Sequence, residues 1–271
     1  MTRFCSGHET NLALFLVASS SFAGVVQPLG ASPQVLIPAA GNAQGANGTF
    51  FKSDISIINL ASHDQLVALQ WLPQGTSASG TPMTITMPAR TGLRSSDFVH
   101  DYFGQTGVGA IIVTGITSAG TVDSTAALYV NSRIWTPEPG TAGTTSQSFP
   151  AVPLSLISTP VAALFAVGGA DDPTHYRVNV GIVNVDQTNT QTFAVTLPGT
   201  TTQTFTVTIP PMSMQQISLG TGISPTAQIS IQNATPSATR SNAWLAYGST
   251  VDNVTGDAWS ELAVVGTGTA P

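Results

Sequence analysis

The sequence has very little charge and no surplus of basic residues. Of its 271 residues, 13 are acidic and 7 are Lys or Arg, so that 7% carry a charge and the formal net charge is −6. An average soluble protein has roughly a quarter of its residues charged. Because Lys52 is the only lysine, there is no basic patch for nucleic acid or anionic lipid, and we expect neither partner. The apolar fraction of 42% also excludes a highly charged, disordered chain.

Cysteine and long apolar runs are equally scarce. The single cysteine, Cys5, lies in the first ten residues, so the rest of the chain can form neither a disulfide nor a thiolate metal site. No later stretch reaches the roughly 18 uninterrupted apolar residues of a membrane helix. The closest one, residues 152–170, is broken by Pro153 and Pro160. We therefore expect no membrane insertion by the part of the chain that follows the N-terminal segment.

The N-terminal segment, residues 1–31, has the pattern of a secretory signal peptide. A polar start precedes the apolar run Leu12–Ala18 and a stretch of small residues, which is the order that signal peptidase substrates show. Cleavage after Ala23 and cleavage after Ala31 both fit, and a short buried helix is the alternative. The segment predicts a protein that is secreted, either extracellular or at the cell surface.

Five segments of the chain recur in the same order, and this indicates an internal repeat. Phe51–Leu60 matches Tyr176–Val185 at an offset of 125 positions, with Asn59 opposite Asn184. The other matches pair Val67–Gln70 with Thr192–Val195, Thr84–Pro88 with Thr206–Pro210, Ile111–Val113 with Ile229–Ile231, and Leu128–Ser132 with Leu245–Ser249. The repeat predicts two units, residues 34–150 and 151–267.

Within each unit, apolar and polar residues alternate, as in Thr204–Ile209. This period of two, with turn residues between short runs, predicts antiparallel β-sandwiches. One exception is Ser95–Gly104, which predicts a helical turn capped by Ser96 and ended by Gly104; its partner segment, Gln216–Gly220, has lost that turn. The exposed faces carry threonine and serine where other proteins have charged residues. The sheet edges therefore lack the charges that usually prevent pairing with strands of other chains, and this favours contact with other chains.

The chain resembles a repeat family of secreted bacterial proteins. The motifs that carry the resemblance are Ile37–Ala40 with Gly45–Asp54, Asp97–Phe98 with Tyr102–Gly104 and Gly109–Ala110, Asn131–Trp135 with Gly140–Gly143 and Phe149–Ala151, and the turn Val251–Asp257. The resemblance covers nearly all of the chain after the signal segment. It implies two tandem Ig-like β-sandwich domains of unassigned function, and it implies no catalytic residues.

Nothing in the sequence has the pattern of a catalytic site. The three histidines after the signal segment, His63, His100 and His175, are not accompanied by the nucleophile motif G-x-S-x-G. Glu138 and Glu261 lie in no distinctive motif. We therefore expect a protein that is not an enzyme. A hydrolase that uses an unrecognised pair of carboxylates stays the third hypothesis, because such a pair is defined by its separation in space.

Two groups of residues are candidate metal ligands. Asp97, His100 and Asp101 lie at positions i, i+3 and i+4 and would share one face of a helical turn; the alternative is that they form the polar side of a turn whose aromatic residues pack inward. Asp252–Asp257 has the acidic composition of a calcium loop but not its spacing, so we expect a hairpin turn, with a calcium loop as the alternative. We expect no cofactor, with calcium as the alternative.

The aromatic residues provide a candidate ligand site. Trp135 and Trp259 lie beside loop-like segments, and with Tyr247 they are candidates for stacking against sugars. Trp71 and Trp244 lie in alternating strands and are assigned to the core. The arginines Arg133 and Arg177 either contact the ligand or pair with Asp54 or Asp123 between the repeats.

Taken together, these features predict a secreted, non-catalytic structural or adhesive protein that acts as an interaction module. Its expected partner is a protein or a glycan at the cell surface, with self-association through sheet edges. The alternative function is a carbohydrate-binding module that uses exposed tryptophans.

Overall fold

A computed structural model of the chain describes residues 30–45, 48–138, 140–157, 162–166, 172–197, 202–224, 226–234 and 243–265. Almost all of the predicted signal peptide lies outside these residues. Within them, none of the helices has both the length and the apolar character needed to cross a membrane. The described residues from Ala31 onward belong to one compact unit.

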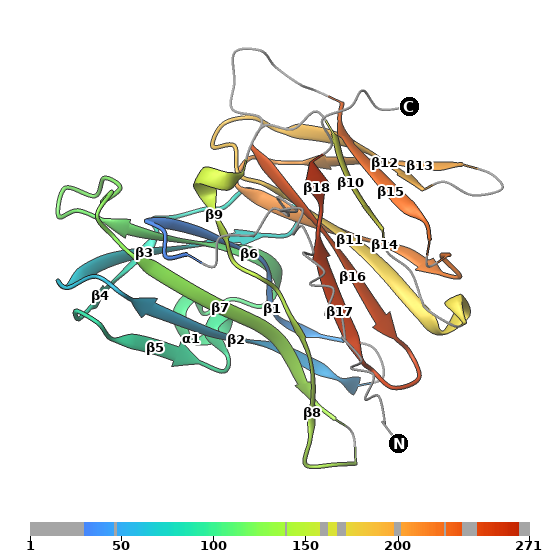
Figure 1. The fold of residues 1–271 in the computed structure, drawn as a ribbon, viewed down its shortest axis with the longest axis horizontal. Coiled ribbons are helices and arrows are strands. Elements are labelled where there is room, and N and C mark those ends of the chain that lie inside the picture. Colours follow the sequence, from blue (N-terminus) through green and yellow to red (C-terminus); the bar gives the residue numbers. More distant parts are fainter. Residues whose placement is uncertain are drawn as a thin grey trace, which may run out of the picture. The chain divides into compact units, whose positions relative to one another are not determined.

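The regular structure is nearly all antiparallel strand, and we call β1–β9 the first half and β10–β18 the second half (Figure 1). The strands of the first half are β1 (Gln34–Gln44), β2 (Phe50–Asn59), β3 (Gln65–Pro73), β4 (Met83–Met87), β5 (Gly92–Ser95), β6 (Gly107–Ile116), β7 (Leu128–Pro137), β8 (Thr144–Ser148) and β9 (Val152–Pro153), with helix α1 (Phe98–Phe103) between β5 and β6. A 3₁₀ turn, Leu154–Leu156, follows.

The second half contains β10 (Ala162–Ala166), the 3₁₀ turn Pro173–His175, β11 (Tyr176–Asn184), β12 (Gln191–Leu197), β13 (Gln203–Ile209), β14 (Ser213–Thr221), β15 (Gln228–Asn233), β16 (Trp244–Asp252), β17 (Ala258–Leu262) and β18 (Val264–Val265). Every pair of neighbouring strands in its sheets is antiparallel. The all-β, sandwich-type fold that the alternation predicts is confirmed.

The two halves pair their strands in the same pattern. In the first half the order is β4-β3-β6-β1-β2-β7-β8, with β5 also on β2 and β9 on β1. In the second half the order β13-β12-β15-β10 corresponds to β4-β3-β6-β1, and β14-β11-β16-β17 corresponds to β5-β2-β7-β8. The prediction of two domains is not tested by this correspondence, but the strand pairing provides a register with which to align the halves.

That register corrects two of the five matched segments by one residue. Leu69 pairs with Met83 as Val195 pairs with Phe205, so β3 aligns with β12 at an offset of 126 positions instead of 125. Similarly, Ile57 pairs with Val130 as Ile182 pairs with Ala246, so β7 aligns with β16 at an offset of 116 positions instead of 117. A slip of one residue exchanges the two faces of a strand, so the sequence match placed several buried residues of one half opposite partly exposed residues of the other.

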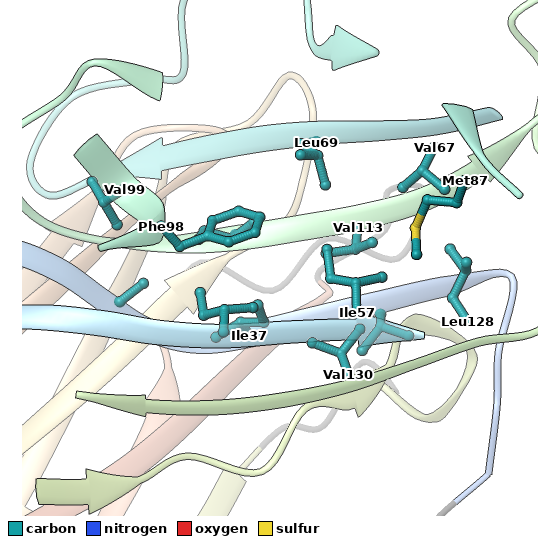
Figure 2. Close-up of a cluster of buried hydrophobic side chains, with 14 residues drawn as sticks. Ile37, Ile57, Val67, Leu69, Met87, Phe98, Val99, Val113, Leu128 and Val130 are labelled. Carbon is teal, nitrogen blue, oxygen red and sulfur yellow. The ribbon is translucent and has the colours of Figure 1, made fainter. Parts of the chain in front are cut away.

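Each half has its own hydrophobic core. The first-half core gathers apolar side chains from β1, β2, β3, β6 and β7 with Phe98 and Val99 of α1. Figure 2 shows these side chains directed into one shared layer, with Phe98 entering beside α1. The second-half core contains Phe193 and Trp244, whose ring centroids lie 5.0 Å apart. Trp244 is 2% exposed, as its assignment to the core predicted.

A third cluster contains residues of both halves, and we call it the shared core. It joins Leu36, Leu72 and Phe149 of the first half to Met214 and Tyr247 of the second. Strands β1 and β6 therefore bury both faces, one in the first-half core and one in the shared core. The second face of these strands is buried because the outer face of one sheet is covered by the other half.

Equivalent positions of the two halves have diverged according to what covers them. Ser56 and Asn131 are paired in the first half, on a face that is partly exposed. By register, Gly181 and Tyr247 occupy the same positions in the second half, where both are buried. The polar pair suits a wet sheet face, and the glycine–tyrosine pair suits a face that packs on another sheet.

A buried asparagine closes the same turn in each half. The Nδ2 group of Asn59 donates to the carbonyl oxygens of His63, Met87 and Pro88, at 2.9–3.2 Å. Its counterpart Asn184 donates to the carbonyl oxygens of Asn189, Ile209 and Pro210, at 2.9–3.1 Å. Both side chains are fully buried, so these hydrogen bonds satisfy amide groups that water does not reach.

Helix α1 has its predicted end and a different beginning. Gly104 ends it with φ 60° and ψ 25°, a left-handed conformation that glycine adopts without strain. The N-cap is Asp97, not Ser96, and Ser95 Oγ accepts the N–H of Asp97 at 3.0 Å. The helix buries Phe98 and Val99 and leaves Tyr102 and Phe103 half-buried.

Candidate functional site

The two tryptophans predicted to bind a ligand lie in different halves and have structural contacts. Trp135, on β7, is half-buried and its Nε1 donates to the carbonyl oxygen of Ser96 at 2.8 Å. Trp259, on β17, is also half-buried and meets Tyr176 edge-on, with ring centroids 5.7 Å apart. Neither contact brings the two indoles together into one platform.

Tyr247 was predicted to belong to that platform, and its position contradicts the prediction. The side chain is fully buried in the shared core, where its ring meets Phe149 at 5.2 Å with an interplanar angle of 76°. Its hydroxyl donates to Oε1 of Gln216 at 2.9 Å, and burial raises the pKa of Tyr247. A ligand at the surface cannot stack on this ring. The sequence alternation did not reveal that the outer face of this strand is covered.

Arg133 belongs to a charged cluster within the first half. Its Nε donates to Oδ2 of Asp54 at 3.0 Å, and Arg94 donates to both carboxylate oxygens of Asp54 at 2.6–2.7 Å. The three side chains line a hollow of about 490 Å³. The predicted pairing of Arg133 with Asp54 is present, but it does not bridge the repeats. The other arginine, Arg177, donates to the side chain of Asn253 within the second half.

The Asp54 cluster predicts a pH-dependent contribution to stability. The hydrogen bond from Arg94 is the largest cause that lowers the pKa of Asp54; burial opposes it, and Arg133 adds to the lowering. A carboxylate with a depressed pKa stabilises the fold fully above its unfolded pKa of about 3.9, and this contribution is lost as the pH falls through the folded pKa. We expect Asp54→Asn to lower the free energy of unfolding at neutral pH by about 1.5–3 kcal/mol.

Urea unfolding at neutral and acidic pH measures this effect. The difference between Asp54→Asn and the native chain should shrink as the pH falls below the unfolded pKa of the carboxylate. The exposed Glu261 provides the control, since Glu261→Gln removes the same charge without disturbing the cluster. A difference at Asp54 that stays constant with pH would show that the arginine bonds do not stabilise the folded state.

The three predicted metal ligands on the helical turn do not form a ligand set. Asp97 is held by Lys52, whose Nζ lies 2.8 Å from Oδ2, and by Asn42, whose Nδ2 lies 2.6 Å from Oδ1. His100 and Asp101 are both exposed, with Nδ1 of His100 3.4 Å from Oδ1 of Asp101. In the part of the chain that the structure describes, no three His, Cys, Asp or Glu residues are grouped to hold a metal ion.

The segment Asp252–Asp257 forms the predicted hairpin turn between β16 and β17. Oδ1 of Asp252 accepts the N–H of Val254 at 2.7 Å, and Oδ2 accepts the hydroxyl of Thr255 at 2.6 Å. Gly256, with φ 79°, donates its N–H to the carbonyl oxygen of Asp252. The Asp252 carboxylate is thus used by its own turn.

Three other aspartates serve turns in the same way. Asp123, Asp172 and Asp186 each accept the N–H of the threonine two residues along, at 2.8–3.0 Å. Hydrogen bonds from threonine hydroxyls are the largest cause that lowers the pKa of Asp123, Asp172 and Asp252. These carboxylates are therefore ionised at neutral pH and hold turns, which suits them poorly to act as general acids.

Several sheet edges are covered by contacts between the halves. The backbone N–H groups of Gly75 and Ala78 donate to the carbonyl oxygens of Met214 and Met212, both at 2.9 Å, next to edge strand β14. Where β8 and β17 meet, the Gln147 side chain donates to the Trp259 carbonyl oxygen and the Ser260 hydroxyl donates to that of Ser148. These three edge strands have neighbours in the other half.

The edge strand β13 lacks such a neighbour. It pairs with β12 on one side, and among the described residues no backbone group of another segment bonds to its other side (Figure 1). Thr204, Thr206 and Thr208 are exposed, whereas Val207 and Ile209 are buried in the second-half core. β4 is a second uncharged edge strand, but it has five residues where β13 has seven.

The sequence predicted that some sheet edges carry no charge, but it did not identify β13 as one of them. The signal was present in Thr204–Ile209, which alternates and carries no charge, but alternation does not say whether a strand is central or at an edge. No protein-family model matches the sequence, and no curated protein is significantly similar to it.

Proposed function

We propose that this protein is a non-catalytic interaction module, acting outside the cell, that associates through the uncharged edge of β13. The observation that carries the proposal is a seven-residue edge strand without charge or proline, whose outer side has no strand beside it among the described residues. Natural proteins usually protect such edges with charge, proline or a covering loop. An edge left open in this way favours addition of a strand from another chain.

The simplest partner for β13 is β13 of a second copy. Two copies related by a two-fold axis would pair antiparallel, with each surface facing an identical one. The exposed threonines would then lie on one face of a continuous sheet, and the apolar side chains would extend the second-half cores. The predicted signal peptide supports an association outside the cell, where a protein or glycan of the cell surface is the alternative partner.

The use of the carboxylates supports a non-catalytic role. Asp54 is held by two arginines, Asp97 by a lysine, and four further aspartates by their own turns. A general acid or base needs a carboxylate that is free to exchange its proton with a substrate. A hydrolase therefore stays the least favoured hypothesis. A glycan-binding role for Trp135 and Trp259 stays a prediction without a shared platform to support it.

Adding a charge to the edge of β13 should weaken the association. We expect Thr206→Lys, at an exposed position in the middle of β13, to raise the dissociation constant of the oligomer by at least about tenfold, or about 1.4 kcal/mol. Like charges would face one another across the paired edges. Sedimentation velocity over a range of protein concentrations measures the change.

Ser118→Lys, in an exposed loop of the first half, adds the same charge away from the edge and should leave the association unchanged. A native chain that stays monomeric at every concentration would contradict self-association. Loss of the oligomer with Thr86→Lys on β4, and not with Thr206→Lys, would contradict the assignment to β13.

A further inference from the structure

A hollow in the first half, which we call the Trp71 pocket, is independent of the β13 edge. It has a volume of about 360 Å³ and lies between β3, the loop of residues 74–82 and the end of α1. Ligand pockets in proteins begin at roughly this size, from about 300 Å³ upward. Three aromatic residues line it: Trp71, Tyr102 and Phe103.

The aromatic side of the pocket is held in place from behind. A Cβ atom at Gly109 would lie 2.5 Å from two carbons of the Trp71 indole, so the ring rests on the backbone of β6. The Phe103 ring lies 6.0 Å from that of Trp71, with an angle of 33° between them. Tyr102 stacks on the buried Phe98 at 4.3 Å. These supports leave half-buried aromatic rings with fixed orientations.

The rest of the lining is uncharged and combines polar side chains with the apolar Leu69, Pro73, Pro82 and Met83. Gln70, Thr81 and Gln105 contribute amide and hydroxyl groups, and none of the residues that line the Trp71 pocket is ionisable as an acid or a base except the tyrosine. Two other hollows among the described residues differ in this respect. One is lined by Arg177, Glu138 and Asp252, and the other by the Asp54 cluster.

The helix that completes the pocket is specific to the first half. By the register of β3 and β12, Leu197 occupies the position of Trp71. In the second half the strand that corresponds to β5 is β14, which continues through the predicted counterpart of α1 without a helix. Because α1 occurs in one half only, the strand pairing that both halves share does not require it. We take this as a sign that α1 has a role in addition to folding.

We propose that the Trp71 pocket binds a neutral carbohydrate, with one sugar ring stacked on the indole of Trp71. A sugar ring presents an apolar face of C–H groups to an aromatic ring, while its hydroxyls need donors and acceptors at the edge. The neutral amides and hydroxyls of the rim match those hydroxyls. An acidic sugar or a nucleotide would require cationic side chains, and a hydrocarbon ligand would bury the polar rim without partners.

The indole N–H resonances of ¹⁵N-labelled protein test this proposal. The probes are soluble hexasaccharides of glucose, xylose, mannose and N-acetylglucosamine, with an oligogalacturonate as the charged comparison. We expect at least one neutral oligosaccharide to shift the Trp71 resonance saturably, while that of the buried Trp244 stays in place. The Trp71 resonance is assigned from its loss in a Trp71→Leu variant.

Trp71→Leu introduces the residue that the second half has at this position, and it should weaken binding at least about tenfold, as measured by calorimetry. Gln105→Ala, at an exposed rim position, is a second variant that leaves the aromatic packing intact and should also weaken binding. Trp259→Leu is the matched control and should bind as the native chain does. Absence of any neutral sugar effect at millimolar concentration, binding of the charged oligomer alone, or loss of binding only in Trp259→Leu would overturn the proposal.

Discussion

Gly181→Val should lower the free energy of unfolding by about 3–5 kcal/mol, because the site has no room for a side chain. A Cβ atom on Gly181 would lie 2.0 Å from Cζ of Tyr247 and 2.1 Å from Cε1. The two residues are directly opposite one another on β11 and β16. The tyrosine ring covers the glycine, an arrangement that packs an otherwise bare stretch of strand.

Any side chain at position 181 would displace Tyr247 from the shared core. The ring would lose its edge-on contact with Phe149, and its hydroxyl would lose the bond to Gln216. Urea unfolding measures the cost. Ser56→Ala, at the equivalent and partly exposed position of the first half, is the control and should change stability by less than about 0.5 kcal/mol.

A double-mutant cycle separates the steric effect from other causes. In a Tyr247→Ala background, Gly181→Val should cost much less than it does in the native chain, because the ring that it collides with is absent. An equal cost in both backgrounds would contradict the packing of the tyrosine on the glycine. A cost below about 1 kcal/mol in the native chain would contradict the tight contact between the tyrosine ring and the glycine.

Asn184→Ala should lower the free energy of unfolding by about 3–4 kcal/mol, since a buried polar group without a partner costs about 1–3 kcal/mol. The variant removes the donor for three carbonyl oxygens, those of Asn189, Ile209 and Pro210. It also removes Oδ1, which accepts the N–H of Asp186 at 3.0 Å and Nε2 of Gln191 at 2.9 Å.

The same substitution in the first half tests whether the shared pattern has a shared energetic role. Asn59→Ala should destabilise the protein by a similar amount, because Asn59 donates to the carbonyl oxygens at the same turn. Asn131→Ala, on an exposed position of β7, should change stability by less than about 0.5 kcal/mol. A large loss at Asn184 with none at Asn59 would contradict equivalent turn closure in the halves.

The strands were predictable from sequence because their side chains alternate. Thr204–Ile209 alternates along its whole length and forms β13, with Val207 and Ile209 buried and the threonines exposed. The asparagines at positions 59 and 184 were matched by position, and both occupy the same place in a turn. An alternation with a period of two shows which residues share a face of the strand. For β13, this was sufficient to predict which side chains are buried and which are exposed.

Whether another segment packs against the outer face of a strand was not predictable from this alternation. Tyr247 and Asn131 occupy equivalent positions by register, yet one is buried in the shared core and the other is exposed. Trp71 was assigned to the core from its strand, but it is half-buried because the Trp71 pocket opens beside it. Such differences arise from contacts between segments far apart in the chain, which local patterns do not encode.

Amide hydrogen exchange at several protein concentrations tests the proposed association most directly. If the chain associates through β13, the exchange of the amides of residues 203–209 should slow as the concentration rises, while that of residues 83–87 in β4 stays constant. The Thr206→Lys variant should show no such slowing. Exchange in β13 that is the same at every concentration, while the protein forms oligomers, would contradict the account and place the interface elsewhere.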